Sequence, residues 1–281
     1  MKGINSSSPH APVSAVIPCY CCRDTIGRAL ASIAAQTILP QEVILIEDAS
    51  PDGGANLDSL LHLADKYANF FVVKIISLMK NSGAGSARNR GWDAAGQPYI
   101  AFLDADDAWH PKKIEIQYGW MLDHPEYGLV GHGHVIQRGG ENSWPTLRSN
   151  FCARSVTKIS ALFSNPFATR TVMLKRDLPF RFKDGKRYAE DYLLWLQIIQ
   201  SVPSAYLDVP LASSYKDEYG SEGLSSRLWK MEAGVLDTYW VLHKEGAITL
   251  FLASCLSIYS LAKYVRRVGI VLGRRLIRCF A

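Results

Sequence analysis

Residues 13–124 alternate between short apolar runs and amphipathic segments, and this alternation constrains the fold more than any other feature. The apolar runs are rich in valine and isoleucine, which is typical of strands buried on both faces of a sheet. They cover 13–18, 42–47, 71–78 and 99–103, and helix-like segments follow at 24–36, 57–67, 86–95 and 112–124. Strands and helices repeating at this spacing predict an α/β fold with a mostly parallel sheet and right-handed crossovers.

From residue 128 onward the pattern is less regular. Strands are predicted at 128–137, 171–174 and 206–210, helices at 190–201 and 228–244, and loops at 138–146 and 215–226. We therefore expect four units: a flexible leader (1–12), a first half (13–127), a second half (128–245) and a separate tail (246–281).

The charge of the chain is uneven. The formal net charge is +5, yet the residues after Glu245 hold six cations and no acid, so the first 245 residues carry −1 (+5 less +6). The basic character belongs to the tail, and nucleic acid is not an expected partner. Six cysteines in 281 residues are too few for a disulfide scaffold and fit a reducing compartment. The first residues show no apolar segment typical of a secretory signal.

The tail begins with sixteen uncharged residues, 247–262, and continues with alternating basic and apolar residues. The uncharged stretch is shorter than the roughly 20 residues that a comfortable membrane span needs. We expect an amphipathic helix lying on an anionic membrane surface, with its cations toward the headgroups. The alternative is an amphipathic helix packed on the domain.

Polar residues follow three of the predicted strands. In an open parallel sheet, ligands bind beyond the carboxyl ends of the strands. The first strand ends in Pro18-Cys19-Tyr20, the second in the acidic turn 47–52, and the fourth in Asp104-Ala105-Asp106. Two carboxylates at i and i+2 can converge on Mg²⁺ or Mn²⁺, which prefer hard oxygen ligands. The alternative is a solvated acidic turn.

Two further segments carry candidate chemistry. Residues 81–91 form a glycine-bearing turn that opens a helix, and backbone N–H groups at such a start favour an anion. The segment matches neither GxGxxG nor GxxxxGK[ST]. Within residues 81–91, Arg88 is the side chain best able to reach a ligand phosphate or base. Glu190-Asp191 opens a later helix, where a carboxylate can serve as general base or complement the helix dipole. The residues alone favour the dipole role.

Taken in order, the segments VSAVIPCY, VILIEDASPDG, NSGAGSARNRG, YIAFLDADDAWHPKK and AEDYLLWL resemble the inverting glycosyltransferase family 2. The resemblance runs from about residue 13 to about residue 228. It implies the GT-A fold, with a nucleotide-sugar-binding half (13–127) continuous with an acceptor-binding half (128–245).

The resemblance also implies a role for each matching residue. Asp191 is the catalytic base with Glu190 beside it, and Asp104 and Asp106 hold a divalent cation, Mn²⁺ or Mg²⁺. The residues implied to contact or surround the donor nucleotide are Pro18, Tyr20, Asp48, Ser50, Asn81, Gly83, Arg88 and Asp104. Two departures exist: Cys21 stands where asparagine is frequent, and the loop 215–226 lacks a histidine that relatives often direct to the metal or diphosphate.

The expected function is transfer of one sugar from a nucleotide-sugar, a UDP-sugar above others, to a hydroxyl of a lipid-linked or envelope glycan such as a lipopolysaccharide or other polysaccharide. The QxxRW signature of processive synthases is absent, which favours single addition. The expected location is the cytoplasmic face of the plasma membrane, peripheral or monotopic. The alternatives are a nucleotidyltransferase on the same scaffold and a membrane-docked nucleotide-sugar-binding protein without turnover.

Overall fold

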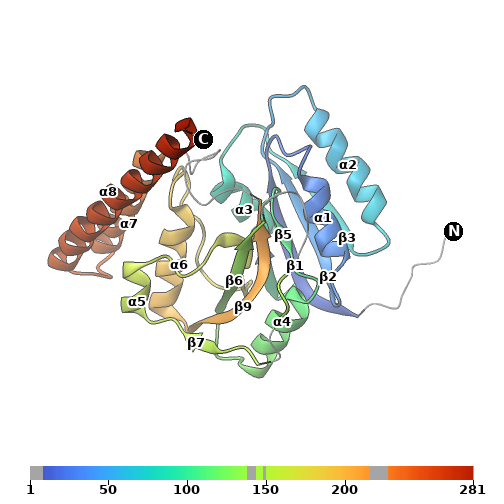
Figure 1. Ribbon diagram of the computed structural model, residues 1–281. Helices are drawn as coiled ribbons and strands as arrows, with labels where there is room; N and C mark the ends of the chain where they lie inside the picture. The colour runs from blue at the N-terminus through green and yellow to red at the C-terminus, as the bar shows by residue number, and fades with distance from the viewer. Residues whose placement is uncertain (1–8, 138–143, 148–149, 216–226, 281) are drawn as a thin grey trace.

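The computed structural model describes residues 9–137, 144–147, 150–215 and 227–280. Within these residues a nine-stranded sheet runs through the molecule with helices on both faces (Figure 1). Its order is β3-β2-β1-β4-β8-β6-β9-β5, with β7 paired to β9. The α/β fold predicted from the sequence is confirmed.

The first half of the sheet is parallel. Its strands are β1 (His10–Cys19), β2 (Leu39–Glu47), β3 (Val72–Ser77) and β4 (Tyr99–Phe102), connected through α1 (Ile26–Ala34), α2 (Ala55–Tyr67) and α3 (Ala84–Asp93). The expected leader 1–12 is wrong for its last residues, because β1 already starts at His10. That residue pairs with Leu39, and its Nε2 lies 2.8 Å from the carbonyl of Phe70.

The second half of the sheet is mixed. Strand β8 (Met173–Lys175) runs antiparallel between β4 and β6 (Leu129–Ile136), and β6 then pairs in parallel with β9 (Ser204–Ser214). The short strands β5 (Ala108–Trp109) and β7 (Ala153–Ser155) both add to β9 in antiparallel fashion. The remaining helices of this half are α4 (Lys113–Asp123), α5 (Lys158–Phe163), the 3₁₀ turn Thr169–Thr171 and α6 (Glu190–Ser201).

Two apolar clusters fill the space between the sheet and its helices. The cluster beneath α3 and α6 contains the aromatic group Trp92, Phe102, Phe182 and Trp195. Helix α3 lies close to β1, because a Cβ added at Gly91 would come within 2.3 Å of a Val16 methyl. This close approach fixes where the side chains of α3 reach the ends of the strands.

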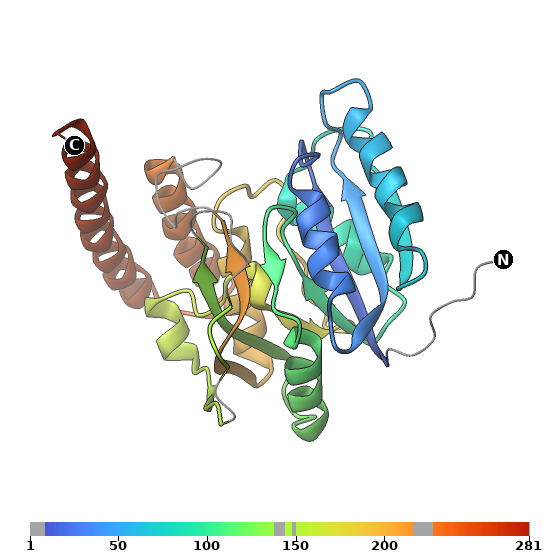
Figure 2. The same ribbon diagram turned by 45° about the vertical axis from the view of Figure 1, so that its right-hand side comes forward.

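The tail forms helix α8 (Leu250–Phe280), which packs against α7 (Leu228–Lys244), the last helix of the second half. They lie on the side of α6 that faces away from β1–β3 (Figures 1 and 2). Among the described residues, no helix has both the length and the apolar character needed to cross a membrane.

Candidate active site

A buried carboxylate shapes the turn after β2, and a serine hydroxyl joins this turn to the turn after β1. Glu47 accepts hydrogen bonds from the backbone N–H groups of Ala49 (3.0 Å) and Ser50 (2.8 Å), and the Ser50 hydroxyl accepts the N–H of Cys21 (3.0 Å). Burial alone would raise the pKa of Glu47, but the bonds from Ser50, Asn56 and Ala49 outweigh it and lower that pKa. Cys21 and Ala49 both have positive φ, 48° and 52°, a strained conformation that surrounding bonds must hold.

Asp48 anchors the turn that opens α3. Its buried carboxylate accepts the N–H groups of Ser82 (2.7 Å) and Gly83 (2.8 Å) and the side-chain amide of Asn81 (3.1 Å). Gly83 has φ 87°, which a residue with a Cβ rarely adopts. Asp48, Asn81 and Gly83, three of the residues predicted around the donor, therefore lie together, and Asp48 holds the shape of the turn.

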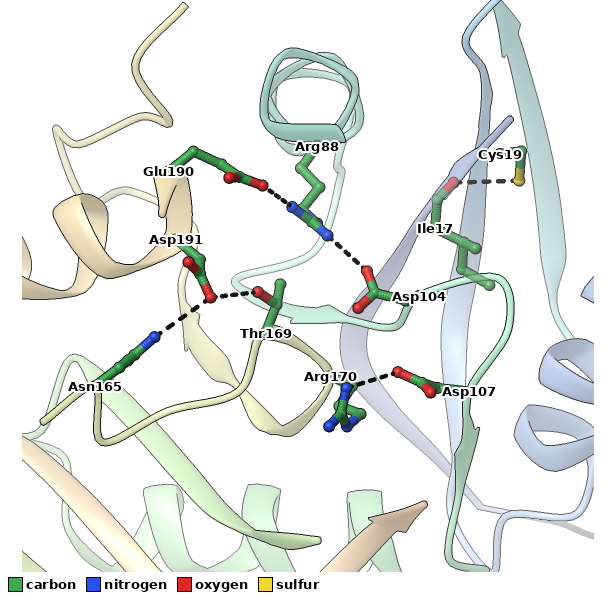
Figure 3. A network of polar contacts seen from close by, with 10 residues as sticks. All are labelled: Ile17, Cys19, Arg88, Asp104, Asp107, Asn165, Thr169, Arg170, Glu190 and Asp191. Carbon is green, nitrogen blue, oxygen red and sulfur yellow. Dashed lines mark hydrogen bonds and ion pairs between the residues drawn. The ribbon is translucent and has the colours of Figure 1, made fainter. Parts of the chain in front are cut away.

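Arg88 links the acids after β4 to the acids that begin α6 (Figure 3). One guanidinium nitrogen lies 2.6 Å from Oδ1 of Asp104 and the other 3.4 Å from Oε1 of Glu190. The side chain is only 6% exposed, so its guanidinium faces these carboxylates from inside the protein instead of projecting to an exposed ligand site. Burial would lower the pKa of Arg88, but Asp104 and Glu190 together raise it.

Asp191 and Glu190 stand at the start of α6, next to Ala189, whose φ is 52°. Oδ1 of Asp191 accepts the N–H of Tyr192 (2.7 Å), while Oδ2 is 3.3 Å from the Thr169 hydroxyl (Figure 3). Burial raises the pKa of Asp191, and burial together with the charge of Asp191 raises the pKa of Glu190 to about 7. Two neighbouring carboxyls thus titrate unusually high, a condition that suits proton transfer near neutral pH.

The acids after β4 divide between two environments. Asp104 is 26% exposed and contacts Arg88, whereas Asp107 is buried and lies 3.1 Å from Arg170. Burial, opposed by Arg170, raises the pKa of Asp107 to about 7. The backbone carbonyl of Asp106 accepts a hydrogen bond from Arg28 at 2.6 Å, which fixes the turn between Asp104 and Asp107.

Asp104 and Asp106 are the candidate ligands of a divalent cation. Nowhere in the described part of the chain do three His, Cys, Asp or Glu side chains gather in a way that would hold a metal. Mg²⁺ and related ions are commonly held by one or two carboxylates, with substrate phosphates and water completing the shell. Asp104 and Asp106 are two carboxylates of the kind that such a partial site needs. Residues 216–226, most of the loop in which relatives often carry a further histidine, lie outside the described part.

Four residues of the site were not found from the sequence. Asn165, Thr169 and Arg170 come from the irregular segment before β8 and reach Asp191 or Asp107 (Figure 3). Arg187 lies just before α6 and donates to Oδ1 of Asn81 at 3.0 Å. No motif or periodicity marks any of them.

A groove of about 1040 Å³ opens beside this site, between the end of β3, the outer face of α3 and residues 181–187. It shares Asn81 and Ser82 with the turn that Asp48 anchors. Cations outnumber carboxylates in its lining, which favours anionic groups at this edge of the site. The charged lining residues are Lys80, Arg90, Arg181, Arg187, Asp93 and Asp184.

An α/β fold with acids after β4 and at the start of α6 agrees with the glycosyltransferase class that the sequence motifs predict. Residues 14–186 match the family described as "Glycosyl transferase family 2", and the chain belongs to this family. TuaG of Bacillus subtilis (strain 168), provisionally named a teichuronic acid biosynthesis glycosyltransferase, is 27% identical over 83% of this chain and 87% of its own.

Two further comparisons agree with this assignment, one in sequence and the other in fold alone. The Escherichia coli enzyme WfgD, named UDP-Glc:alpha-D-GlcNAc-diphosphoundecaprenol beta-1,3-glucosyltransferase, is 29% identical over 67% of this chain and 70% of its own. The crystal structure of residues 1–349 of S. aureus TarS, in complex with UDP-GlcNAc, superimposes with a TM-score of 0.63 at 19% identity. It covers 82% of this chain and 66% of the TarS chain, and at this identity it establishes the fold alone.

Proposed function

We propose that the enzyme transfers one sugar from a UDP-sugar to a hydroxyl of a lipid-linked or envelope glycan acceptor, with inversion at the anomeric carbon. The observation that carries this proposal is the position of Arg88, which has Asp104 on one side and Glu190 on the other. The names of WfgD and of the TarS complex support a UDP-sugar, and that of WfgD supports a diphosphoundecaprenol-linked acceptor.

The donor nucleotide occupies the ends of β1 and β2 in this proposal, within the half 13–127. Tyr20 is 49% exposed and offers an aromatic face to the base, and Pro18 precedes it at the end of β1. Asp48 and Ser50 act mainly by holding the two turns in place, because their polar atoms bind backbone N–H groups there.

Asp104 and Asp106 are the residues that would hold Mn²⁺ or Mg²⁺. The chemistry that a cation held there would supply is neutralisation of the charge that develops on the diphosphate leaving group. Arg88 adds a fixed positive charge next to Asp104 and keeps that carboxylate oriented.

Asp191 is the proposed base. The Tyr192 N–H and the Thr169 hydroxyl hold its two oxygens, so the carboxylate is fixed before the acceptor arrives. It takes the proton of the acceptor hydroxyl as that oxygen attacks the anomeric carbon from the face opposite the diphosphate. This single displacement forms one glycosidic bond, breaks the bond to the nucleoside diphosphate and inverts the configuration.

Asp191→Asn tests this assignment, with Asp123→Asn at the exposed end of α4 as the matched control. Removing a general base costs roughly 10²- to 10⁴-fold in rate. Transfer should fall by that factor in Asp191→Asn while nucleotide affinity stays, and the control should behave as wild type. Wild-type transfer by Asp191→Asn would eliminate it as the base, and loss of nucleotide binding along with transfer would point to a structural defect.

The same proposal places the enzyme on the cytoplasmic face of the plasma membrane through α8. The outer face of this helix carries a stripe of exposed apolar side chains at helical spacing. Phe251, Ile258 and Val265 follow one another at intervals of seven residues and are 79%, 70% and 69% exposed. Arg266 is exposed beside the stripe, and the sequence beyond it adds further cations. An apolar stripe flanked by cations complements an anionic lipid surface.

Replacing the three stripe residues by serine should release the protein from vesicles that contain phosphatidylglycerol. The matched control replaces Leu61, Val72 and Leu122, three exposed apolar residues of other elements, by serine. Only the stripe variant should lose binding in a sedimentation assay. Equal binding by both variants would refute the membrane role of α8.

A further inference from the structure

Two cysteines at the end of β1 have the spacing and setting of a reactive dithiol. Cys19 is the last residue of β1, and Cys22 follows three positions later. The carbonyl of Cys22 accepts the N–H groups of Thr25 and Ile26, both at 2.9 Å, as the chain enters α1. A C-x-x-C segment between a strand and a helix is a setting in which paired thiols take part in redox chemistry.

The two thiols are neighbours inside the turn. Cys19 is fully buried and Cys22 is 6% exposed, and each thiol perturbs the pKa of the other. The Cys19 thiol donates to the carbonyl of Ile17 at 3.5 Å (Figure 3). Asn56 accepts both the N–H (3.0 Å) and the thiol (3.5 Å) of Cys22, which fixes the position of that side chain. The positive φ of Cys21 turns the chain so that its own side chain is exposed instead.

The pair is electronically asymmetric. The neighbouring Cys19 thiol, opposed by burial and aided by Asn56, lowers the pKa of the Cys22 thiol. Burial raises the pKa of the Cys19 thiol well above its usual range. Cys22 is therefore the more easily deprotonated of the two cysteines. Cys19 stays protonated and can react with an oxidised Cys22 to form a disulfide.

We propose that Cys19 and Cys22 form a redox site that a hydroperoxide converts to an intramolecular disulfide. The Cys22 sulfur attacks the peroxide oxygen, which gives a sulfenic acid and releases water or an alcohol. The Cys19 sulfur then displaces hydroxide from that sulfenic acid, and a second water leaves. The two thiols lose two hydrogens and two electrons in total, and the peroxide accepts them. A small-molecule thiol reverses the step by thiol–disulfide exchange.

Oxidation should also weaken donor binding, a consequence that rests on the proposed function. The thiols now bond Ile17 and Asn56, so bringing their sulfurs to the S–S distance of about 2.05 Å requires the turn to move. That turn carries Tyr20, and the N–H of Cys21 binds the Ser50 hydroxyl that joins it to the turn after β2. Tyr20 and Ser50 both belong to the donor site proposed above.

The test uses the full-length Cys21→Ser variant, so that the tryptic peptide 3–23 retains Cys19 and Cys22 as its thiols. The protein is treated with hydrogen peroxide, alkylated and analysed by mass spectrometry, with the exposed Cys152 and Cys255 as internal monothiol controls. The peptide should lose two hydrogens and escape alkylation, and dithiothreitol should restore both thiols. The site is refuted if both thiols remain alkylatable under conditions that oxidise Cys152 and Cys255.

A second arm measures UDP binding by calorimetry before and after oxidation. At least a tenfold loss of affinity, recovered on reduction, supports the coupling to the donor site. Disulfide formation with unchanged UDP affinity overturns the coupling, while the dithiol itself is upheld by the mass spectra. Reduced protein that binds no UDP contradicts the proposed function and leaves the thiol result intact.

Discussion

Arg88→Met tests whether one buried guanidinium holds the two groups of acids together. The substitution keeps an unbranched apolar side chain on α3 and removes the charge that faces Asp104 at 2.6 Å and Glu190 at 3.4 Å. Glu190 is only 12% exposed, so its carboxylate would remain inside the protein without a cation. The substitution should therefore destabilise the fold and disturb the site together.

The expected magnitude follows from the burial of the partners. Removing one member of a buried ion pair costs about 3–5 kcal/mol. Because Asp104 is 26% exposed and partly solvated, we expect the lower end, about 3 kcal/mol. For a chain of this size that corresponds to a Tm lower by about 6–12 °C.

The loss should depend on pH. Burial, aided by Asp191, raises the pKa of Glu190 to about 7 even though Arg88 opposes the shift. An acid with a raised pKa binds its proton more tightly when folded, so its contribution to stability falls as pH rises from about 4.3 through about 7. Without Arg88 the pKa of Glu190 rises further, and the deficit of the variant should grow above pH 7 and shrink toward pH 5.

Urea unfolding between pH 5 and 8 measures this deficit, with Arg90→Met on the exposed side of α3 as the control. The control should lie within about 0.5 kcal/mol of wild type. Arg88→Met combined with Glu190→Gln should recover part of the loss, because the stranded charge is then gone. A variant as stable as the control, or a double variant whose losses simply add, would refute the linking role of Arg88.

Further predictions concern the surroundings of Asp191. Gly234→Ala should lower both stability and kcat, because its Cβ would come within 2.5 Å of the carbonyl of Tyr188, two residues before the acids of α6. Gly119→Ala is the control: its Cβ would meet no atom within 4 Å, so the change should be neutral or slightly stabilising. Thermal unfolding and steady-state transfer measure both effects. The acidic limb of the kcat/KM profile should lie above the ordinary aspartate range, because burial raises the pKa of Asp191. Arg88→Met should shift this limb to higher pH, because Arg88 lowers the pKa of Asp191. A limb near pH 4 in both proteins would contradict the assignment of Asp191 as the base.

Long periodic elements were predictable from the sequence. Helices α6 and α7 begin and end where predicted, because their apolar residues recur at helical spacing. Strands β1 and β2 extend further than expected, since His10 and Leu39 pair beyond the apolar runs. Pro40 lies in β2 near a register shift, where a strand tolerates the missing N–H.

Short elements and long-range contacts were not predictable. Strands β5 and β7 have two and three residues, too few for a periodic pattern, and exist through pairing with β9. The motif containing Arg88 was visible, but its contact with Glu190, 102 residues away, depends on how α3 and α6 pack. The C-x-x-C spacing of Cys19 and Cys22 is present in the sequence, but it does not reveal that both thiols are buried in the same turn.

The most direct test of the account is a thermal-shift measurement across UDP-, GDP- and TDP-sugars, with and without Mn²⁺, in wild type and in Asp104→Asn/Asp106→Asn. A donor at 100 times its Kd stabilises the folded state by about 2.7 kcal/mol, or a Tm increase of about 5–11 °C. We predict this shift for one UDP-sugar, dependent on Mn²⁺ and absent from the double variant. No shift with any donor in folded protein, or an undiminished shift in the double variant, would contradict a metal-dependent nucleotide-sugar transferase.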